Sequence, residues 1–70
     1  MKIGDRVEVV AIPKVLPDDE TRALFTRCLS RHFPVADLRG HLVELEVGEA
    51  VEKPSYMHSI WIERDCVRLI

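Results

Sequence analysis

The segment that most constrains the fold is the last thirteen residues, His58–Ile70. Successive side chains of a strand point to opposite faces of a sheet, so Ile60 and Ile62 point one way while Trp61 points the other. A strand with apolar residues on both faces is expected to be covered on both sides. The polar run Glu63–Asp65 then predicts a tight turn, after which the apolar alternation resumes in a short closing strand. The pattern predicts a small sheet that closes on itself.

Length and composition predict one folded domain, residues 1–70, close to the lower size limit for independent folding. Hydrophobic residues make up 47% and charged residues 31% of the chain, which is typical of soluble globular proteins. The longest apolar run, Val9–Ile12, is too short to span a bilayer, and no signal segment opens the chain. We therefore expect a cytoplasmic protein that makes no membrane contact.

The first half of the chain predicts one strand and one helix. The strand covers residues 7–12 and stops at Pro13, because proline lacks the backbone donor that a sheet needs. Asp18 or Asp19 can cap the helix that follows. Apolar residues then recur at the spacing of one helix face, at Leu24, Phe25, Cys28, Leu29 and Phe33. These signals predict a helix at about residues 19–32.

The second half predicts a β-hairpin. Residues 35–40 are interpreted as a short irregular connection, and they lead into an alternating strand over residues 41–47. A loop then returns the chain to a strand over residues 56–62. If the two strands pair, Val43 lies near Ile60 and Leu45 lies near His58 on the core side.

The opposite side of this hairpin gathers Trp61, Met57 and Leu42. The predicted helix also has an apolar face without a partner. An open apolar patch on so small a domain would be an association site, so packing the helix on this side is the simplest arrangement.

Both ends of the chain resemble SH3-like small barrels. The resemblance rests on the opening Ile3–Val9 and the close Trp61–Ile70, where Arg64–Cys66 occupies the place of the short 3₁₀ turn that precedes the last strand in many such barrels. It implies a mainly β fold with one inserted helix, an SH3-like five-stranded small barrel. The chain lacks the aromatic-rich first loop with which eukaryotic SH3 domains grip polyproline, so polyproline binding is not implied.

Two further resemblances concern parts of the chain. The Gly4–Val7 opening is similar to the ferredoxin–thioredoxin reductase variable chain and to the barrel of nitrile hydratase beta subunits, both of which are noncatalytic and support another subunit. The segments Leu45–Glu49 and Tyr56–Glu63 resemble small uncharacterised bacterial proteins. That last likeness implies no activity.

Candidate chemical groups are few. Cys28 and His32 lie four residues apart on the predicted helix, and His41, His58 and Cys66 could in principle complete a metal site. Zinc needs about four ligands and no second closely spaced pair exists, so structural or surface roles are favoured for all five residues. Structural roles are likewise favoured over a redox role for the pair Cys28 and Cys66, and over a proton-shuttle role for His58. No nucleophile and base adjoin, so we expect no enzyme, no metal and no cofactor.

The charged residues suggest one acidic and one basic region of the surface. The acidic run through the third strand and its loop comprises Glu44, Glu46, Glu49 and Glu52, and the basic residues that could oppose it are Arg22, Arg27, Arg31 and Arg39. Runs of this kind are most often solvated faces, although the acidic one could also dock a basic partner. The formal net charge of −2 provides no overall positive field to attract nucleic acid.

The preferred functional hypothesis is a noncatalytic protein-binding or accessory module. Its contact surface would be Trp61, Met57, Leu42 and Tyr56, and its partner would be an unidentified protein or a second copy of the chain. A tryptophan flanked by isoleucines is more often a core residue than a contact residue, so the core remains the alternative place for Trp61. The alternative is a nucleic-acid-binding small barrel that uses Arg27 and Arg31, which the acidic balance disfavours.

Overall fold

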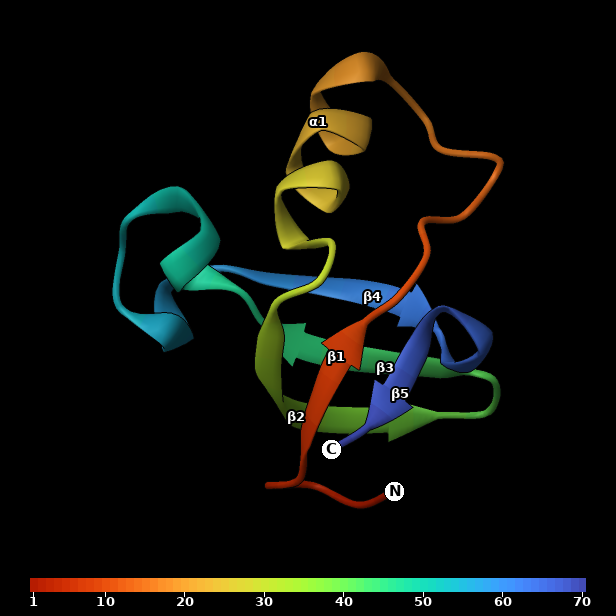
Figure 1. The fold of residues 1–70 in the computed structure, drawn as a ribbon, viewed down its shortest axis with the longest axis vertical. Coiled ribbons are helices and arrows are strands. Elements are labelled where there is room, and N and C mark those ends of the chain that lie inside the picture. The colour runs from red at the N-terminus through yellow and green to blue at the C-terminus, as the bar shows by residue number, and fades with distance from the viewer.

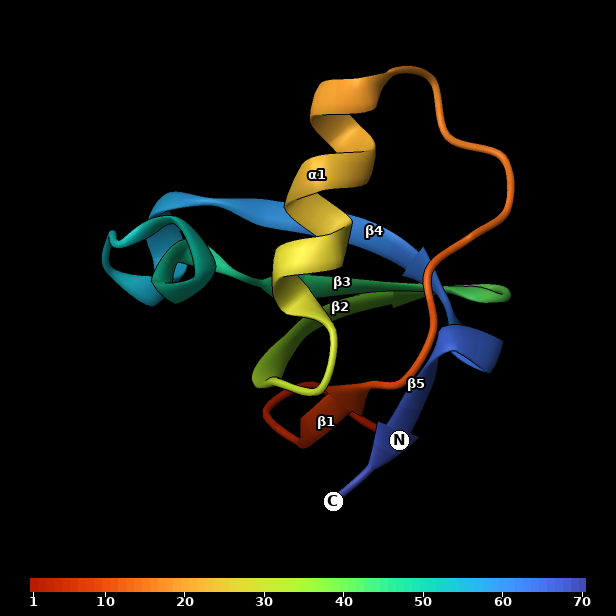
Figure 2. The same cartoon turned by 45° about the horizontal axis from the view of Figure 1, so that its top comes forward.

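The computed structural model describes residues 1–70 as five antiparallel strands in one sheet and one helix (Figure 1). The strands lie in the order β4-β3-β2-β1-β5, and a long loop joins β1 to the helix (Figure 2). The helix is not long and apolar enough to cross a membrane. The elements are β1 (Arg6–Val9), α1 (Asp19–Cys28), β2 (His32–Arg39), β3 (Leu42–Glu46), β4 (Ser59–Glu63) and β5 (Val67–Leu69), with the 3₁₀ turns η1 (Gly48–Val51), η2 (Ser55–Met57) and η3 (Arg64–Cys66).

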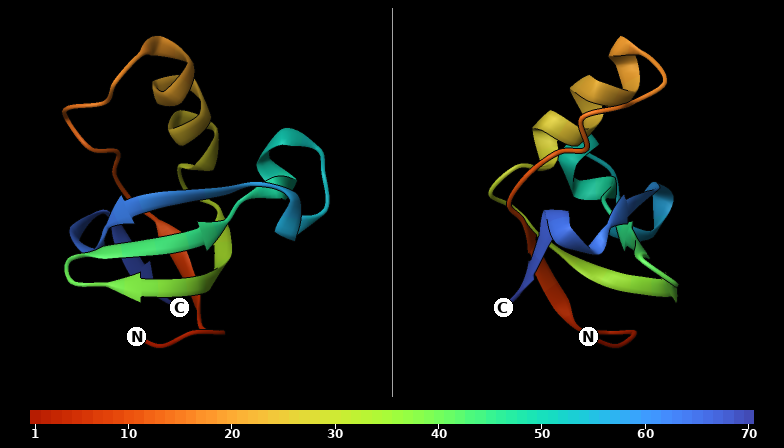
Figure 3. Two further views of the ribbon diagram at one scale, coloured as in Figure 1. Left: turned by 180° about the vertical axis from the view of Figure 1, so that it is seen from behind. Right: turned by 90° about the vertical axis from the view of Figure 1, so that its right-hand side faces the viewer.

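The sheet is curled but not closed. β4 pairs only with β3 and β5 pairs only with β1, so the two outer strands do not pair with each other. The two views of Figure 3 show β2, β3 and β4 as one layer, with β1 and β5 crossing on its other side. The chain is therefore mainly β with one helix inserted after the first strand, and the expected closure of the sheet is not confirmed. The predicted turn and short last strand are confirmed as η3 and β5.

β1 stops three residues before the predicted end of its strand. The backbone amides of Val10 and Ala11 both donate to the carbonyl oxygen of Cys66, at 2.8 and 3.3 Å. After Val9 the backbone is therefore hydrogen-bonded to η3, and regular strand pairing ends. This contact joins residues more than fifty positions apart, which the local sequence pattern does not reveal.

α1 begins where the sequence predicts. The backbone amide of Thr21 donates to Oδ1 of Asp18 at 2.7 Å, which satisfies one of the free amides of the first helical turn. This hydrogen bond also lowers the pKa of the Asp18 carboxyl, because it favours the charged form. Asp19 and Glu20 follow in the first turn, where negative charge suits the helix dipole.

α1 ends at Cys28, so the predicted helix over residues 19–32 is wrong in its last turn. Ser30 adopts a left-handed conformation with φ of 64°, and its amide donates to the carbonyl oxygen of Val9 at 2.8 Å. The carbonyl oxygen of Arg31 in turn accepts from the Val9 amide at 3.0 Å. Bonding to β1 therefore replaces the helical bonds that would have continued α1.

β2 is an eight-residue strand, although residues 35–40 are predicted to be irregular. The amide of Val35 donates to the carbonyl oxygen of Asp5 at 2.8 Å, so the nitrogen of its neighbour Pro34 points away from β1. A proline is tolerated there because it removes no bond of the β1–β2 ladder. The register with β3 shifts between Val35 and Asp37, and this bulge disrupts the alternation by which a strand is recognised.

β3 and β4 form the predicted hairpin, but in a different register. Val43 is paired with Ile62 and Leu45 with Ile60, whereas the sequence predicts Ile60 and His58 as the two partners. A shift of two residues leaves every side chain on the same face, so hydrophobic alternation cannot detect it. β4 also begins later than predicted, because η2 precedes it.

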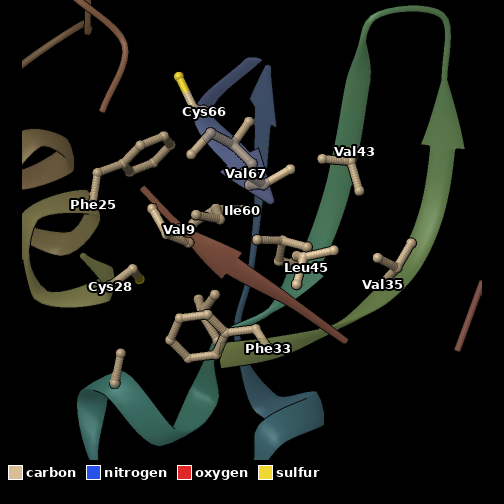
Figure 4. Packing of buried hydrophobic residues seen from close by; sticks show 14 residues of the cluster. Val9, Phe25, Cys28, Phe33, Val35, Val43, Leu45, Ile60, Cys66 and Val67 are labelled. Atoms are coloured by element: carbon tan, nitrogen blue, oxygen red, sulfur yellow. The ribbon is translucent and has the colours of Figure 1, made fainter. Parts of the chain in front are cut away.

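The core lies between α1 and the inner side of the sheet. Figure 4 shows Phe25 and Cys28 of α1 pointing toward the strands. The helix thus covers the face that carries Ile60, and the expectation that it packs against Trp61 is wrong. The fourteen residues of the core are Val7, Val9, Phe25, Cys28, Phe33, Val35, Val43, Leu45, Val47, Ala50, Ile60, Ile62, Cys66 and Val67.

Candidate binding surface

The outer face of β3 and β4 is the side that α1 does not cover. Along β4 the buried residues alternate with exposed ones, and along β3 they alternate with half-buried ones. The outer positions are Leu42, Glu44 and Glu46 on β3, and Ser59, Trp61 and Glu63 on β4. This face is continuous across both strands because the register between them has no shift.

Trp61 stands in the middle of this outer face with 36% of its surface exposed. It is paired with Glu44 across the hairpin. The guanidinium of Arg39, at the end of β2, lies 5.4 Å from the centre of the indole ring. This distance suits a cation–π contact, and Leu42 lies between the two residues, opposite Arg39 and diagonal to Trp61. The outer face therefore already holds one guanidinium against its tryptophan.

Tyr56 and Met57 lie in η2, immediately before β4, and expose 73% and 56% of their surface. Met57 and Trp61 are four positions apart, which places their Cα atoms at most about 13 Å from each other. Of the four predicted contact residues, Leu42 is half-buried and the other three are exposed. The prediction that Trp61 and Leu42 share one face of the hairpin is confirmed by the pairing.

The turn that presents Tyr56 and Met57 depends on Gly48. A Cβ atom at Gly48 would lie 1.9 Å from the carbonyl oxygen of Pro54, which is closer than atoms can approach. The amide of Lys53 donates to the carbonyl oxygen of Gly48 at 2.9 Å, and Ser55 Oγ donates to the carbonyl oxygen of Glu46 at 3.3 Å. Two segments of backbone therefore pack directly on each other, and η2 is held against the end of β3.

The charge of the outer face is mainly negative. Glu44 accepts a hydrogen bond at Oε2 from Ser59 Oγ at 2.9 Å. Glu46 and Glu63 share this face, and Asp37 of β2 is paired with Glu44 from the other side. Glu44, Glu46 and Glu63 are thus the carboxylates that neighbour Trp61 in the hairpin, and the guanidinium of Arg39 opposes them. Asp37 lies one strand further away, where its Oδ1 accepts from the Leu38 amide at 2.8 Å. The proximity of Arg39 to Trp61 depends on the register, so the sequence pattern does not reveal it.

The arginines do not form the continuous basic helix face that the alternative hypothesis needs. Arg31 lies beyond the end of α1, where its guanidinium contacts the carbonyl oxygen of Glu49 at 3.4 Å and lies 5.8 Å from the ring of Phe33. Arg22 donates to the carbonyl oxygen of Lys14 at 3.2 Å.

Arg27 lines a cleft of about 290 Å³ between α1 and η1, together with Glu20, Ala23, Leu24 and Val51. The two charged groups of this cleft, Glu20 and Arg27, have opposite signs. The cleft therefore offers no concentration of positive charge to a phosphate.

The candidate metal ligands do not come together. Because α1 ends at Cys28, His32 is the first residue of β2 and the two residues do not share a helix face. No group of three His, Cys, Asp or Glu side chains is placed to hold a metal ion. His32, His41 and His58 are exposed.

Both cysteines are free thiols and belong to the core. Burial raises the pKa of the Cys28 thiol, an effect that nearby Arg31 partly offsets. Burial also raises the pKa of Cys66, and the carboxylates of Glu63 and Asp65 raise it further. Since the thiolate is the reactive form of cysteine, these environments suppress nucleophilic chemistry.

Comparisons of the chain with protein-family models, with curated proteins and with solved structures find no match.

Proposed function

We propose that this chain is a noncatalytic protein-binding or accessory module built on an SH3-like five-stranded barrel with one inserted helix. The antiparallel strand order and the 3₁₀ turn before the last strand support that fold assignment. The contact surface is the outer face around Trp61, extended by Leu42 and by Tyr56 and Met57 of η2.

The observation that carries the proposal is the position of Trp61. Its side chain is excluded from the core, because Ile60 and Ile62 on either side of it point inward. A tryptophan on an exposed sheet face leaves apolar area in contact with water, and a partner that covers it removes that area. Tryptophan, tyrosine and arginine are the residues that most often dominate binding energy at protein interfaces. Trp61 and Arg39 supply two of the three in direct contact, and Tyr56 is exposed in η2, before the start of β4.

The experiment is affinity capture from native lysate at low and high salt, with both protein and nucleic acid measured in the eluate. The wild-type chain is expected to retain a stoichiometric protein at both salt concentrations, since apolar contacts are weakly screened. Trp61→Ala should lose that protein. Leu69→Ala, which removes an apolar side chain that is 52% exposed on β5, serves as the matched control and should retain it.

Capture that is unchanged by Trp61→Ala would contradict the proposed surface. Nucleic acid that is retained only at low salt, and lost on changing Arg27 or Arg31, would instead favour the nucleic-acid-binding alternative. Arg31 lies beyond the end of α1 and contacts Glu49, whereas Arg27 lines the cleft between α1 and η1, so the two do not form the continuous basic helix face that this alternative needs.

A further inference from the structure

β4 is an open edge of the sheet. The carbonyl oxygen of His58 accepts from the Val47 amide, and the amide of Arg64 donates to the carbonyl oxygen of His41, each at 2.8 Å. The even-numbered residues from His58 to Arg64 therefore point their backbone N–H and C=O groups toward β3. Backbone groups alternate along a strand, so those of Ser59 and Trp61 point away from β3. No strand pairs with β4 on that side, and no turn or loop hydrogen bond reaches these two residues.

This edge lacks several of the features by which proteins prevent strand addition, although it carries one charged side chain, Glu63. Such features include lysine or proline in the edge strand, bulges and very short length. β4 contains neither lysine nor proline, and its five residues pair with β3 without a register shift. The opposite edge, β5, has only three residues, and the amide of Val67 is occupied by the carbonyl oxygen of Arg64. β4 is therefore the edge suited to receive a strand.

The charge of the outer face determines which side chains favour binding of an added strand. An added strand places every second side chain on the outer face, beside Trp61 and Glu63 and within reach of Glu44. Three carboxylates, those of Glu44, Glu46 and Glu63, share the outer face of β3 and β4 with Trp61, and the guanidinium of Arg39 offsets them in part. A second copy of the chain would bring its own carboxylates of β3 and β4 toward the same place, which like-charge repulsion opposes. The contact between Arg39 and Trp61 shows how a cation can lie on the indole.

We infer that β4 accepts an extended basic segment of a partner protein as an added strand. The lysine or arginine side chains of that segment occupy alternate positions over the outer face at Trp61, Glu44 and Glu63. Main-chain hydrogen bonds to Ser59 and Trp61 hold the segment, and the outer-face charges select it. This inference rests on the proposed function, because it names the class of partner for the same surface.

The test is selection of a displayed library of random twelve-residue peptides on the wild-type protein. Peptides with lysine or arginine at every second position are expected to be enriched. Their binding should weaken with salt but not be lost, because the apolar contact with Trp61 is weakly screened. It should fall by about tenfold in Glu44→Gln, because a charged partner is lost. Enrichment of acidic or proline-rich peptides, or no enrichment, would overturn the inference.

Two variants of Ser59 separate edge pairing from binding to the face alone. Ser59→Pro removes the outward amide, and the extended conformation of His58, with φ of −149° and ψ of 139°, is compatible with a following proline. Binding of the selected peptides should fall about tenfold or more in Ser59→Pro. Ser59→Ala removes only the hydroxyl bond to Glu44 and is the control, with binding expected to stay within about threefold of the wild type. Thermal unfolding of each variant verifies that it is folded.

A second measurement uses the unmodified protein. A selected peptide is synthesised with N-methyl groups on alternate amides, in both possible phases. One phase should abolish binding and the other should retain it, because only every second amide of an added strand faces β4. Equal effects of both phases would overturn strand addition.

The two proposals can fail separately. Peptides that bind Ser59→Pro as well as the wild type but are lost in Trp61→Ala would leave the protein-binding surface in place and reject the added strand. Failure of both the peptide selection and the lysate capture would reject both.

Discussion

The two faces of the β3–β4 hairpin differ although they come from the same ten residues. On the inner face Val43, Leu45, Ile60 and Ile62 are between 0% and 6% exposed. On the outer face the central residues are Glu44, which is half-buried, and Trp61, which is 36% exposed. The inner face is covered by α1 and by the crossing strands, so its residues stabilise the fold. The outer face contributes little to the core, and its composition is free to serve binding.

The strongest way to break this comparison is to truncate one residue on each face of β3. Leu45→Ala should cost about 2–5 kcal/mol, because it leaves a cavity in the core. A domain of this size is stabilised by only about 3–5 kcal/mol, so the variant should be largely unfolded at room temperature. Glu44→Ala should cost less than about 1 kcal/mol. Urea unfolding followed by circular dichroism measures both, and similar losses would mean that the two faces are not distinct.

A second large effect is expected where β3 leaves the sheet. Gly48→Ala forces a Cβ atom into the backbone of Pro54 and should cost at least about 2 kcal/mol. Gly40→Ala is the matched control: Gly40 has φ of 56°, but no atom lies within 4 Å of the place that an alanine methyl would occupy, so the cost should be about 1 kcal/mol. The same unfolding measurement compares them. A larger loss for Gly40→Ala would show that backbone strain outweighs the close approach.

Trp61→Ala sharpens the comparison on the outer face. Loss of a partly exposed indole and of its contact with Arg39 should lower the free energy of unfolding by about 1 kcal/mol. Ile62→Ala on the inner face of the same strand should cost about 2–5 kcal/mol. Binding, in contrast, should be lost in Trp61→Ala. A Trp61→Ala variant that fails to fold would place this side chain in the supporting core.

The smallest effect is a pH dependence from Cys28 of α1, which lies in the core on the inner side of the sheet. Burial raises the pKa of Cys28 in the folded state, so the folded chain keeps this proton at pH values where the unfolded chain releases it. The contribution to stability is complete below the ordinary thiol pKa and is lost as the pH rises through the folded pKa. Cys28→Ala should therefore show a shallower alkaline loss of stability than the wild type, by urea unfolding at several pH values. An unchanged slope would contradict this assignment.

Local signals identify some elements correctly because the relevant contacts are short in sequence. Asp18 caps α1 through Thr21, three residues away. The polar turn before the last strand is likewise formed by neighbouring residues. The end of α1 escapes prediction because Ser30 bonds to Val9, twenty-one positions earlier, and β2 escapes it because Pro34 and a bulge obscure its alternation.

The sequence predicts which residues share the candidate surface, but it does not predict which of them are neighbours. The alternation of apolar and polar residues places Trp61 and Leu42 on one face of the hairpin, and the pairing confirms this. That Arg39 lies on Trp61 and that Glu44 is opposite it depends on register. A slip of two residues changes every cross-strand neighbour without changing the face, so the pattern contains no information about it.

The sequence by itself determined which residues alternate along β3 and β4, where α1 begins and where the chain turns before its last strand. Each of these depends on steric and hydrogen-bonding preferences of adjacent residues. Only the tertiary structure decided that α1 covers the side of Ile60 and leaves Trp61 exposed, and that β4 ends the sheet as an open edge. β4 carries large apolar residues on both faces, Ile60 and Ile62 on one and Trp61 on the other, and the path of the chain through β1 and α1 decides which face is covered.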